Sequence, residues 1–453
     1  MSIDAYLEEN RDRHLEELFD LLRIPSISTD PQYDADIARG AEFVAKSLKD
    51  AGCSATIHQT KGHPIVTAEW LGAPGAPTVL VYGHYDVQPP APLELWRNPP
   101  FEPTIEDGNI IARGATDDKG QFYCHVKGVE AHLKTAGKLP VNVKVLREGE
   151  EESGSESLEP FIEAHKEELA ADIVLISDNS MFAPGRPAIT LGLRGMVYFE
   201  LHVTGPSHDL HSGLYGGAVK NPINGLCQLI SSMQGEGGSI AISGFYDDVE
   251  KLSEAERAEM AEVNHDDVAW AEGIEVEGSI GEDGYSILER TTIRPTMDVN
   301  GMWGGYIDAG AKTVLPSQAH AKISCRLVPN QDPIDIEAKI RAHIAEHCPE
   351  GLKIDFVAHH GGIPFVVNSE APALDAAKAA LGRVWGTEAV MLRSGGSIPV
   401  VASFKEMMGL DSVMMGLGLP DDRLHSPNEK FSLECYFNGI RSSAYIFEEL
   451  GKV

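Results

Sequence analysis

Side chains that could bind a metal ion or transfer a proton follow three apolar segments of this 453-residue chain. They are His84, Asp86, Glu151, Glu152 and Asp178, and each lies a few residues beyond a segment with the composition of a buried strand. Ligands of open α/β sheets gather at the carboxyl ends of the strands, so these side chains could share one site. Taken singly, each has a more ordinary explanation, such as a hydrogen-bonded pair, a solvated acidic run or a turn.

Asp117 and His425 could complete this group from loops. Asp117 comes just before a predicted helix, where it could simply cap the helix N-terminus, but one carboxylate can also bridge two cations. His425 precedes another helix, and a loop histidine taken alone is more often surface decoration than a ligand. Imidazole and carboxylate donors without thiolate suit Zn²⁺, Mn²⁺ or Co²⁺ in a site that holds two metal ions.

The charges of such a site would balance. The three adjacent glutamates of residues 150–152 would repel one another unless cations or protons offset their charge. Two divalent cations would balance one hydroxide and the carboxylates of Asp117, Glu152 and Asp178. Glu151 would then lie outside the metal ligands and be free to act as a base.

The overall composition limits the partners and the compartment. Lys and Arg number 37 and Asp and Glu 69, which gives a formal net charge of −32. This charge disfavours phosphate backbones and anionic membrane surfaces, so we expect neither a nucleic acid nor a membrane partner. The six cysteines are scattered, the N-terminus has no secretory pattern, and no apolar run approaches the roughly 20 residues of a membrane span. We therefore predict a cytoplasmic protein.

Strands and helices alternate in the first part of the chain. The predicted strands are 65–68, 78–82, 141–146 and 172–176, and the predicted helices are one near the N-terminus that Pro25 ends, then 36–51, 119–135 and 157–169. This alternation predicts an α/β domain with a largely parallel sheet.

The pattern changes near Gly195. Strands are predicted at 197–203, 319–328 and 352–357, with a helix at 334–347, whereas the acidic stretch 235–289 has no clear period. The α/β pattern then resumes with a helix at 371–384 and a strand at 413–416. We therefore predict a discontinuous catalytic domain of residues 1–195 and 365–453. A smaller α+β domain for a lid or dimerisation, residues 196–364, is inserted into it.

Seven motifs occur in an order that resembles a family of dinuclear metallopeptidases. This family contains the aminoacylases, carboxypeptidase G, succinyl-diaminopimelate desuccinylase and the carnosinase-like dipeptidases, and the similarity is greatest to its dipeptidases. The matching segments are 82–89, 113–120, 150–155, 209–213, 324–329, 395–400 and 425–430. Each motif is modest, but the ordered set covers nearly the whole chain.

The resemblance implies a role for each candidate ligand. One metal would be held by His84, Asp117 and Asp178, and the other by Asp117, Glu152 and His425. The peptide bond after the bridging Asp117 would be cis.

The resemblance also implies the residues that act beside the metals. Asp86 would orient His84, and Glu151 would be the general base. His211 would reach across a homodimer into the partner's active site and stabilise the oxyanion, and Arg326 would clamp the substrate carboxylate. The lesser substrate contacts would be Thr313, His360, Gly395, Gly396 and Ser397.

The implied activity is hydrolysis of the amide bond of dipeptides or short peptides with a free C-terminal carboxylate. The enzyme would be a metallopeptidase of the dipeptidase or carboxypeptidase type, with two Zn²⁺ ions, or alternatively Mn²⁺ or Co²⁺. One alternative within the same family is an N-acyl amino acid deacylase or desuccinylase. An alternative of another class is a catalytically inactive metal-binding scaffold.

Overall fold

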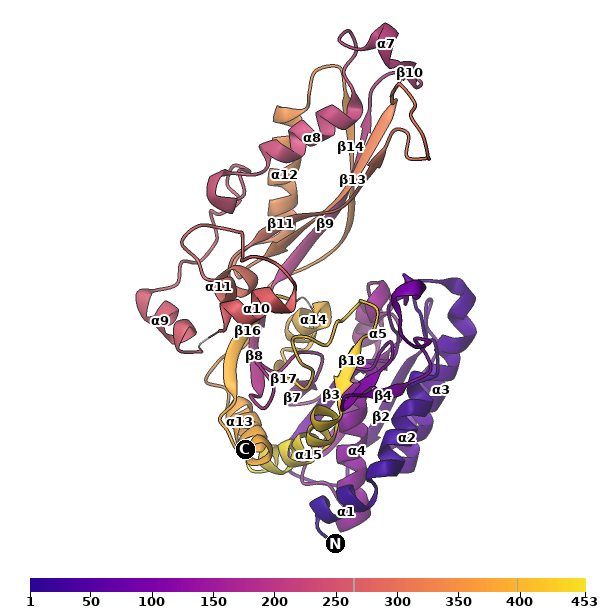
Figure 1. Ribbon diagram of the computed structural model, residues 1–453. Helices are drawn as coiled ribbons and strands as arrows, with labels where there is room; N and C mark the ends of the chain where they lie inside the picture. Colours follow the sequence, from indigo (N-terminus) through magenta and orange to yellow (C-terminus); the bar gives the residue numbers. More distant parts are fainter. Residues whose placement is uncertain (264, 397) are drawn as a thin grey trace. The chain divides into compact units, whose positions relative to one another are not determined.

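In the computed structural model, which describes residues 1–263, 265–396 and 398–453, the four central strands of the larger sheet are parallel (Figure 1). In their order across the sheet they are β6 (Asn142–Glu148), β3 (Thr78–His84), β7 (Ile173–Ile176) and β17 (Asp411–Gly416). The flanking strands are antiparallel to their neighbours, namely β1 (Ser54–His58) and β2 (Ile65–Trp70) beside β6, and β8 (Ala188–Leu193) beside β17. The predicted α/β fold with a largely parallel sheet is confirmed.

Helices on one face of this sheet contribute to the main hydrophobic core. They are α3 (Asp34–Ala51), α4 (Lys119–Ala136), α13 (Pro372–Trp385) and α15 (Leu433–Leu450). α3 ends at Gly52, whose φ of 113° lies in the left-handed region that closes many helices at a glycine. Val79 and Val81 of β3 belong to this core, whereas Tyr82 contacts Phe404 of α14 (Pro399–Met408), with ring centroids 5.8 Å apart.

The first predicted helix is two helices, α1 (Ile3–Glu9) and α2 (Arg11–Leu22). The break falls at Asn10, whose side-chain Nδ2 donates to the backbone oxygen of Tyr6. Asparagine side chains compete in this way with the helical hydrogen bonds of the backbone. The predicted helix 157–169 is likewise divided into α5 (Leu158–Ala164) and α6 (Lys166–Leu169).

The chain divides into two compact units. Unit 1 comprises Met1–Leu191, Val367–Leu392 and Ser403–Val453, and unit 2 comprises Gly192–Val366 and Arg393–Ala402. The sequence predicts boundaries at 195/196 and 364/365 and assigns residues 393–402 to the catalytic domain, whereas they cluster with unit 2. Two hydrogen bonds from Arg194, to the backbone oxygens of Gly395 and Gly396, hold this segment beside the start of β9.

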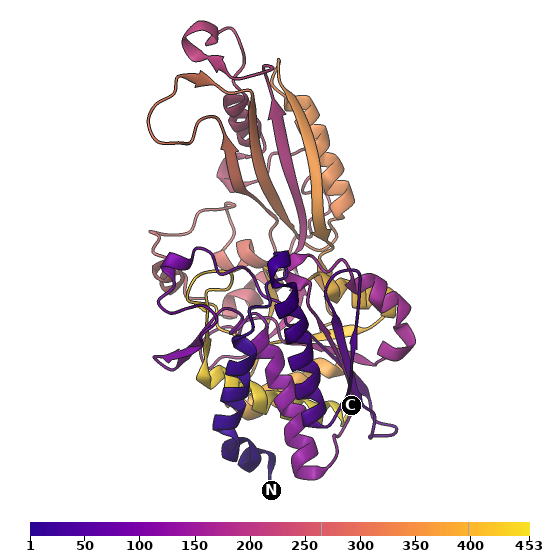
Figure 2. The same ribbon diagram turned by 90° about the vertical axis from the view of Figure 1, so that its right-hand side faces the viewer.

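Unit 2 is built on an antiparallel sheet of four long strands. Their order is β11 (Thr296–Gly304), β13 (Gln318–Leu327), β9 (Gly195–Thr204) and β14 (Lys353–Gly362). Figure 2 shows these strands side by side, with α8 (Pro222–Ser232) and α12 (Pro333–His347) behind them. Buried residues such as Phe199 and Leu201 alternate with half-buried ones along β9, so one face packs against the helices and the other carries polar side chains.

The acidic stretch 235–289 contains helices that its poor period did not predict. They are α9 (Glu254–Glu262), α10 (Asp267–Gly273) and α11 (Ile287–Thr292). α9 and α11 begin with capping boxes, in which Ser253 pairs with Glu256 and Ser286 with Glu289. The S-x-x-E pattern was therefore a local sequence signal for the start of both helices. Apolar periodicity gave no further signal, because these helices are short and weakly periodic.

Short elements complete the two units. In unit 1 the hairpin β4 (Thr104–Glu106) and β5 (Asn109–Ile111) is joined by β18 (Lys430–Ser432). Other short elements are β10 (Leu210–His211), α7 (Ser212–Tyr215), β12 (Val314–Leu315), β15 (Phe365–Val366) and β16 (Val390–Ser394).

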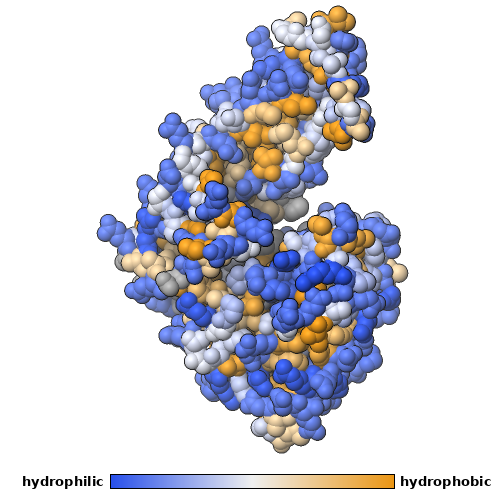
Figure 3. Space-filling model, viewed as in Figure 1, coloured by the Kyte–Doolittle hydropathy of each residue, from blue (hydrophilic) through white to orange (hydrophobic). Residues whose placement is uncertain are grey.

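The surface agrees with the composition of the chain, 23% of which is charged residues. The face seen in Figure 3 is mostly hydrophilic, with hydrophobic residues in small groups. In the described residues we find no helix with the length and apolar character that crossing a membrane requires.

Candidate active site

Five side chains that the sequence singled out come together in unit 1. They form two overlapping groups, His84, Asp117 and Asp178 in one and Asp117, Glu152 and His425 in the other. Within each group the candidate ligand atoms all lie within 4.8 Å of one another. Two groups that share one aspartate fit a site for two metal ions with a bridging carboxylate.

The order of the strands explains why these residues meet. His84 is the last residue of β3, and Asp178 follows the end of β7, which is paired with β3 in parallel. Glu152 lies in a 3₁₀ turn (Glu151–Ser153) that follows β6, the other parallel neighbour of β3. Three adjacent parallel strands therefore deliver their polar C-terminal residues to the same edge of the sheet.

Asp117 lies between the two histidines. Its Oδ1 atom is 3.2 Å from Nε2 of His84, and its Oδ2 atom is 3.0 Å from Nε2 of His425. Each carboxylate oxygen therefore faces a different imidazole, as expected of a bridging ligand. The peptide bond between Asp117 and Asp118 is cis, as the resemblance implied.

Asp86 is placed to orient His84. Nδ1 of His84 lies 3.2 Å from the backbone oxygen and 3.3 Å from Oδ1 of Asp86, while Oδ2 of Asp86 accepts a hydrogen bond from the backbone N–H of Glu152. Nε2 of His84 is buried and faces two carboxylates, with Asp117 Oδ1 at 3.2 Å and Asp178 Oδ2 at 4.0 Å. A histidine that is held at one ring nitrogen and turns the other toward further candidate ligands is typical of a metal ligand.

The carboxylates of this site are too close to carry full charge without cations. Burial raises the pKa of Glu151 and of Asp178 well above its usual value, and the neighbouring carboxylates raise it further. Burial and the charge of Asp117 also raise the pKa of Glu152. Bound cations would reverse this repulsion, so the excess of negative charge fits a site for divalent metals.

His425 is the exposed member of the group. Hydrogen bonds to Asp117 and Glu152 raise the pKa of His425 to about 10, and its Nε2 lies 3.3 Å from Oε2 of Glu152. Its backbone φ of 59° is in the left-handed region, which costs about 1–2 kcal/mol for a residue with a β-carbon. Such backbone outliers cluster at functional sites, where the surrounding structure holds them.

Glu429 supports the loop that carries Asp117, a role that the sequence analysis did not assign. Its buried carboxylate accepts hydrogen bonds from Arg113 Nη1 at 2.7 Å and from the backbone N–H groups of Gly114, Thr116 and Asp117. The signal was present, because Arg113 and Glu429 are charged residues inside two of the seven motifs.

Gln88 is a second residue that the analysis did not assign. Its Nε2 donates to Oε2 of Glu152 at 2.8 Å and to the backbone oxygen of the same residue at 3.2 Å. Gln88 lies in the motif of residues 82–89, directly after Asp86 and Val87, and it limits the orientations open to Glu152.

Unit 2 contains Arg326 and the glycines of the 395–396 loop. Arg326 lines a cavity of about 410 Å³ together with Arg194 and Asp298. Burial lowers the pKa of Arg194, the charge of Arg326 adds to this effect, and the resulting pKa is about 10. Two guanidinium groups close together in a cavity favour an anionic ligand such as a carboxylate. Arg194, which also binds the oxygens of Gly395 and Gly396, was not among the predicted site residues.

His211 and Thr313 are exposed and lie side by side on a two-stranded ribbon. His211 of β10 pairs with Val314 of β12, and the backbone oxygen of Thr313 accepts from Ser212. This ribbon adjoins the end of β13 at Gln318, and Arg326 lies eight residues further along the same strand. Because a strand rises about 3.3 Å per residue, Gln318 and Arg326 are about 26 Å apart. His211 and Arg326 of one chain are therefore too far apart to contact the same dipeptide.

Two predicted substrate contacts cannot be placed. His360 belongs to β14, but its side chain lies outside the described part of the structure, and Ser397 lies outside the described residues.

Comparison with known proteins agrees with the geometry of unit 1. The description "Peptidase family M20/M25/M40" matches residues 80–449. The chain is 33% identical to Cys-Gly metallodipeptidase dug1 of Schizosaccharomyces pombe over 472 residues, which cover 100% of this chain and 99% of the relative.

Two solved structures are similar over nearly the whole chain. Human carnosine dipeptidase 1 has a TM-score of 0.90 and 31% identity, with 100% of this chain and 98% of that chain covered. A family M20 metallo-carboxypeptidase from Sulfolobus solfataricus has a TM-score of 0.87 and 34% identity, with 97% and 99% covered.

Proposed function

Because the chain belongs to peptidase family M20/M25/M40 and is a metallopeptidase, we propose that it cleaves dipeptides with a free C-terminal carboxylate at a two-metal centre. The observation that carries the proposal is the position of Asp117, whose two oxygens face the imidazoles of His84 and His425. The relatives support dipeptides as the substrate class, since one is a Cys-Gly metallodipeptidase and another a carnosine dipeptidase.

The ligands we propose are His84, Asp117 and Asp178 for one ion and Asp117, Glu152 and His425 for the other. Two cations held there would supply Lewis-acid chemistry, since they acidify water and polarise a carbonyl group. Zn²⁺ is the first choice for two imidazoles with carboxylates, and Mn²⁺ and Co²⁺ are the alternatives.

Glu151 is the proposed general base. Its carboxylate takes a proton from the attacking water and later returns it to the leaving amine, so one group serves both halves of the reaction. Burial raises the pKa of Glu151 and so increases its affinity for a proton, which a general base needs.

A substrate panel tests the activity. We expect the zinc-loaded protein to hydrolyse Cys-Gly and β-Ala-His and to release little product from N-acetyl or N-succinyl amino acids. The measurement is kcat/KM for each compound, together with a blocked peptide that reports cleavage from the C-terminus. Preference for the N-acyl compounds would favour the deacylase or desuccinylase alternative. Sequential release from the blocked peptide would favour a carboxypeptidase, and bound metal without hydrolysis would favour the inactive scaffold.

Arg326 is the proposed clamp for the substrate carboxylate. Arg326→Ala should raise KM for dipeptides by roughly 10- to 100-fold, because charge-assisted hydrogen bonds worth about 1.5–3 kcal/mol are lost. Arg326→Lys keeps the charge but not the bidentate geometry, so an intermediate effect is expected. The control is the same dipeptide as its C-terminal amide, whose kcat/KM should change little. An equal loss on the amide would contradict the clamp.

His211 is proposed to act in the active site of a partner chain within a homodimer. The distance of about 26 Å along β13 between the His211 ribbon and Arg326 supports this, because a dipeptide is far shorter. Thr313 on the same ribbon, together with Gly395, Gly396, His360 and Ser397, are the proposed lesser contacts. In the transition state a good donor to the oxyanion contributes about 3 kcal/mol.

Co-expression of two inactive variants tests the shared site. His211→Ala and Glu151→Gln should each be nearly inactive alone, whereas mixed dimers should regain activity. In a mixed dimer the intact Glu151 of one chain faces the intact His211 of the other. Activity of the purified mixed dimer is the measurement, and a mixed dimer as inactive as its parents would contradict the role of His211 in the partner.

A cytoplasmic location remains part of the proposal. All six cysteines are free, which suits a reducing compartment.

A further inference from the structure

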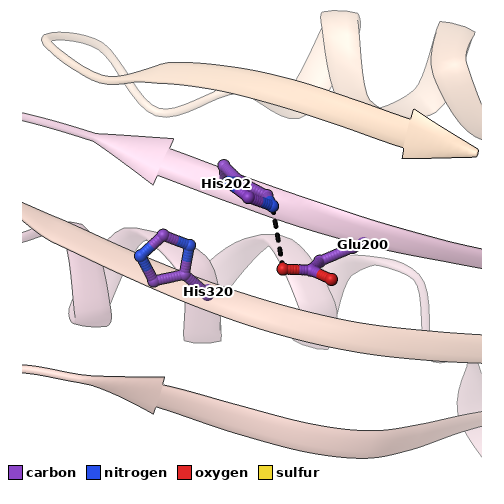
Figure 4. Close-up of side chains that lie close together, drawn as sticks. All are labelled: Glu200, His202 and His320. Atoms are coloured by element: carbon purple, nitrogen blue, oxygen red, sulfur yellow. Dashed lines mark ion pairs between the residues drawn. The ribbon is translucent and has the colours of Figure 1, made fainter. Parts of the chain in front are cut away.

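Three metal-ligating side chains meet on the polar face of the unit 2 sheet. Glu200 and His202 lie two residues apart on β9, and His320 lies directly opposite His202 on β13. Figure 4 shows the three side chains close together on the two neighbouring strands. One ligand atom of each lies within 4.8 Å of the others, and Nε2 of His202 is 2.8 Å from Oε1 of Glu200. The group shares no residue with the two groups of unit 1.

The surrounding residues hold the His320 ring in place. Trp303 of β11 pairs with His320 and stacks on it, with ring centroids 5.0 Å apart and an interplanar angle of 11°. The edge of the His202 ring meets it on the other side, with centroids 4.8 Å apart. Nδ1 of His320 is shielded from solvent and has no hydrogen-bond partner in the described part of the chain. A buried imidazole nitrogen without a partner is costly unless a ligand satisfies it.

We propose that Glu200, His202 and His320 bind one Zn²⁺ ion on the polar face of the unit 2 sheet. Two imidazoles and one carboxylate are a three-residue donor set of zinc proteins, and water takes the fourth position. Small side-chain rotations must shorten the present spacing to zinc bonds of about 2.0–2.2 Å. Mg²⁺ prefers an octahedron of oxygen ligands, so this donor set selects against it.

The charges around the group permit cation binding. Histidine binds a metal only in its neutral form. Lys322 lies opposite Glu200 in the register of the two strands. Its Nζ is placed over the Trp303 ring, 5.9 Å from the ring centroid. Within the described residues the ion pairs of Glu200 are with His202 and, at 3.6 Å, His359. A metal would replace the first of these pairs.

Zinc titration of the holoenzyme, with its catalytic centre already loaded, tests the proposal. The wild type should take up one further saturable equivalent of zinc per chain. His202→Ala and His320→Ala should each lower the affinity for this further zinc ion by at least about tenfold. Loss of a residue that only supports a metal ligand already costs about 10- to 100-fold in affinity, so loss of a ligand should cost no less. His208→Ala is the matched control, because His208 is an exposed histidine of the same unit that contacts Ser207. Loss of the stacking on Trp303 could unfold the His320 variant. Glu200→Gln keeps the shape of the side chain and both histidines, and it should also lower the affinity for the further zinc ion.

Chemical modification identifies the ligands independently of the zinc count. Added Zn²⁺ should protect His202 and His320 from diethyl pyrocarbonate, whereas Mg²⁺ should not, and His208 should react equally in both. The proposal would be overturned if the His202 and His320 variants took up the further equivalent of zinc as the wild type does. It would also be overturned if both histidines were modified in the presence of zinc. Neither readout depends on peptide hydrolysis, so the result stands apart from the test of the active site.

Discussion

Glu151→Gln is expected to lower kcat by about 10²–10⁴-fold while both metal ions remain bound. Positioned acid–base groups contribute a factor of this size, and glutamine cannot accept the proton of the attacking water. Glu151 belongs to neither group of candidate ligands, so the metal content should not change. The measurements are kcat on a dipeptide and metal content after dialysis.

Glu156→Gln is the matched control for this variant. Glu156 is an exposed glutamate five residues further along the same acidic segment, and its kcat should stay near that of the wild type. Near-normal turnover by Glu151→Gln would show that another group takes the proton. Loss of metal from Glu151→Gln would instead show that Glu151 is a ligand.

Asp117→Asn should remove both metal ions and with them the activity. The substitution replaces one of two oxygens that face different histidines and removes the negative charge that both cations would share. We expect the affinity for each ion to fall by at least about 100-fold. Loss of a residue that only supports a metal ligand can already cost about 100-fold in affinity, and Asp117 is proposed to be a ligand itself. The measurement is metal content by mass spectrometry after dialysis against metal-free buffer.

Two further variants make the result specific to the bridge. His425→Ala should lose one ion and keep the other, because His425 belongs to only one of the two groups of candidate ligands. Asp107→Asn changes an exposed aspartate of the turn between β4 and β5 and should leave the content unchanged. If Asp117→Asn lost a single ion, as His425→Ala does, Asp117 would be a terminal ligand and the bridged arrangement would be wrong.

Local sequence was sufficient for the main elements of unit 1. β3, β7 and α3 could be predicted because apolar runs and periodicity depend on near neighbours, and Gly52 ends α3 for a local reason as well. It was not sufficient for α9 to α11, since short helices with weak apolar periodicity depend on caps and contacts. The first helix is divided at Asn10, whose side chain makes hydrogen bonds that periodicity does not reveal.

The residue types by themselves determined the chemistry, namely imidazole and carboxylate donors at the ends of buried strands. Only the tertiary structure decided which donors meet, for instance that Asp117 lies between His84 and His425 and that Glu429 supports its loop. The same holds for His202 and His320, which are far apart in the chain but opposite each other in the register of β9 and β13. The physical reason is that hydrophobic periodicity is a local property. Strand order and register, by contrast, result from the packing of the whole sheet.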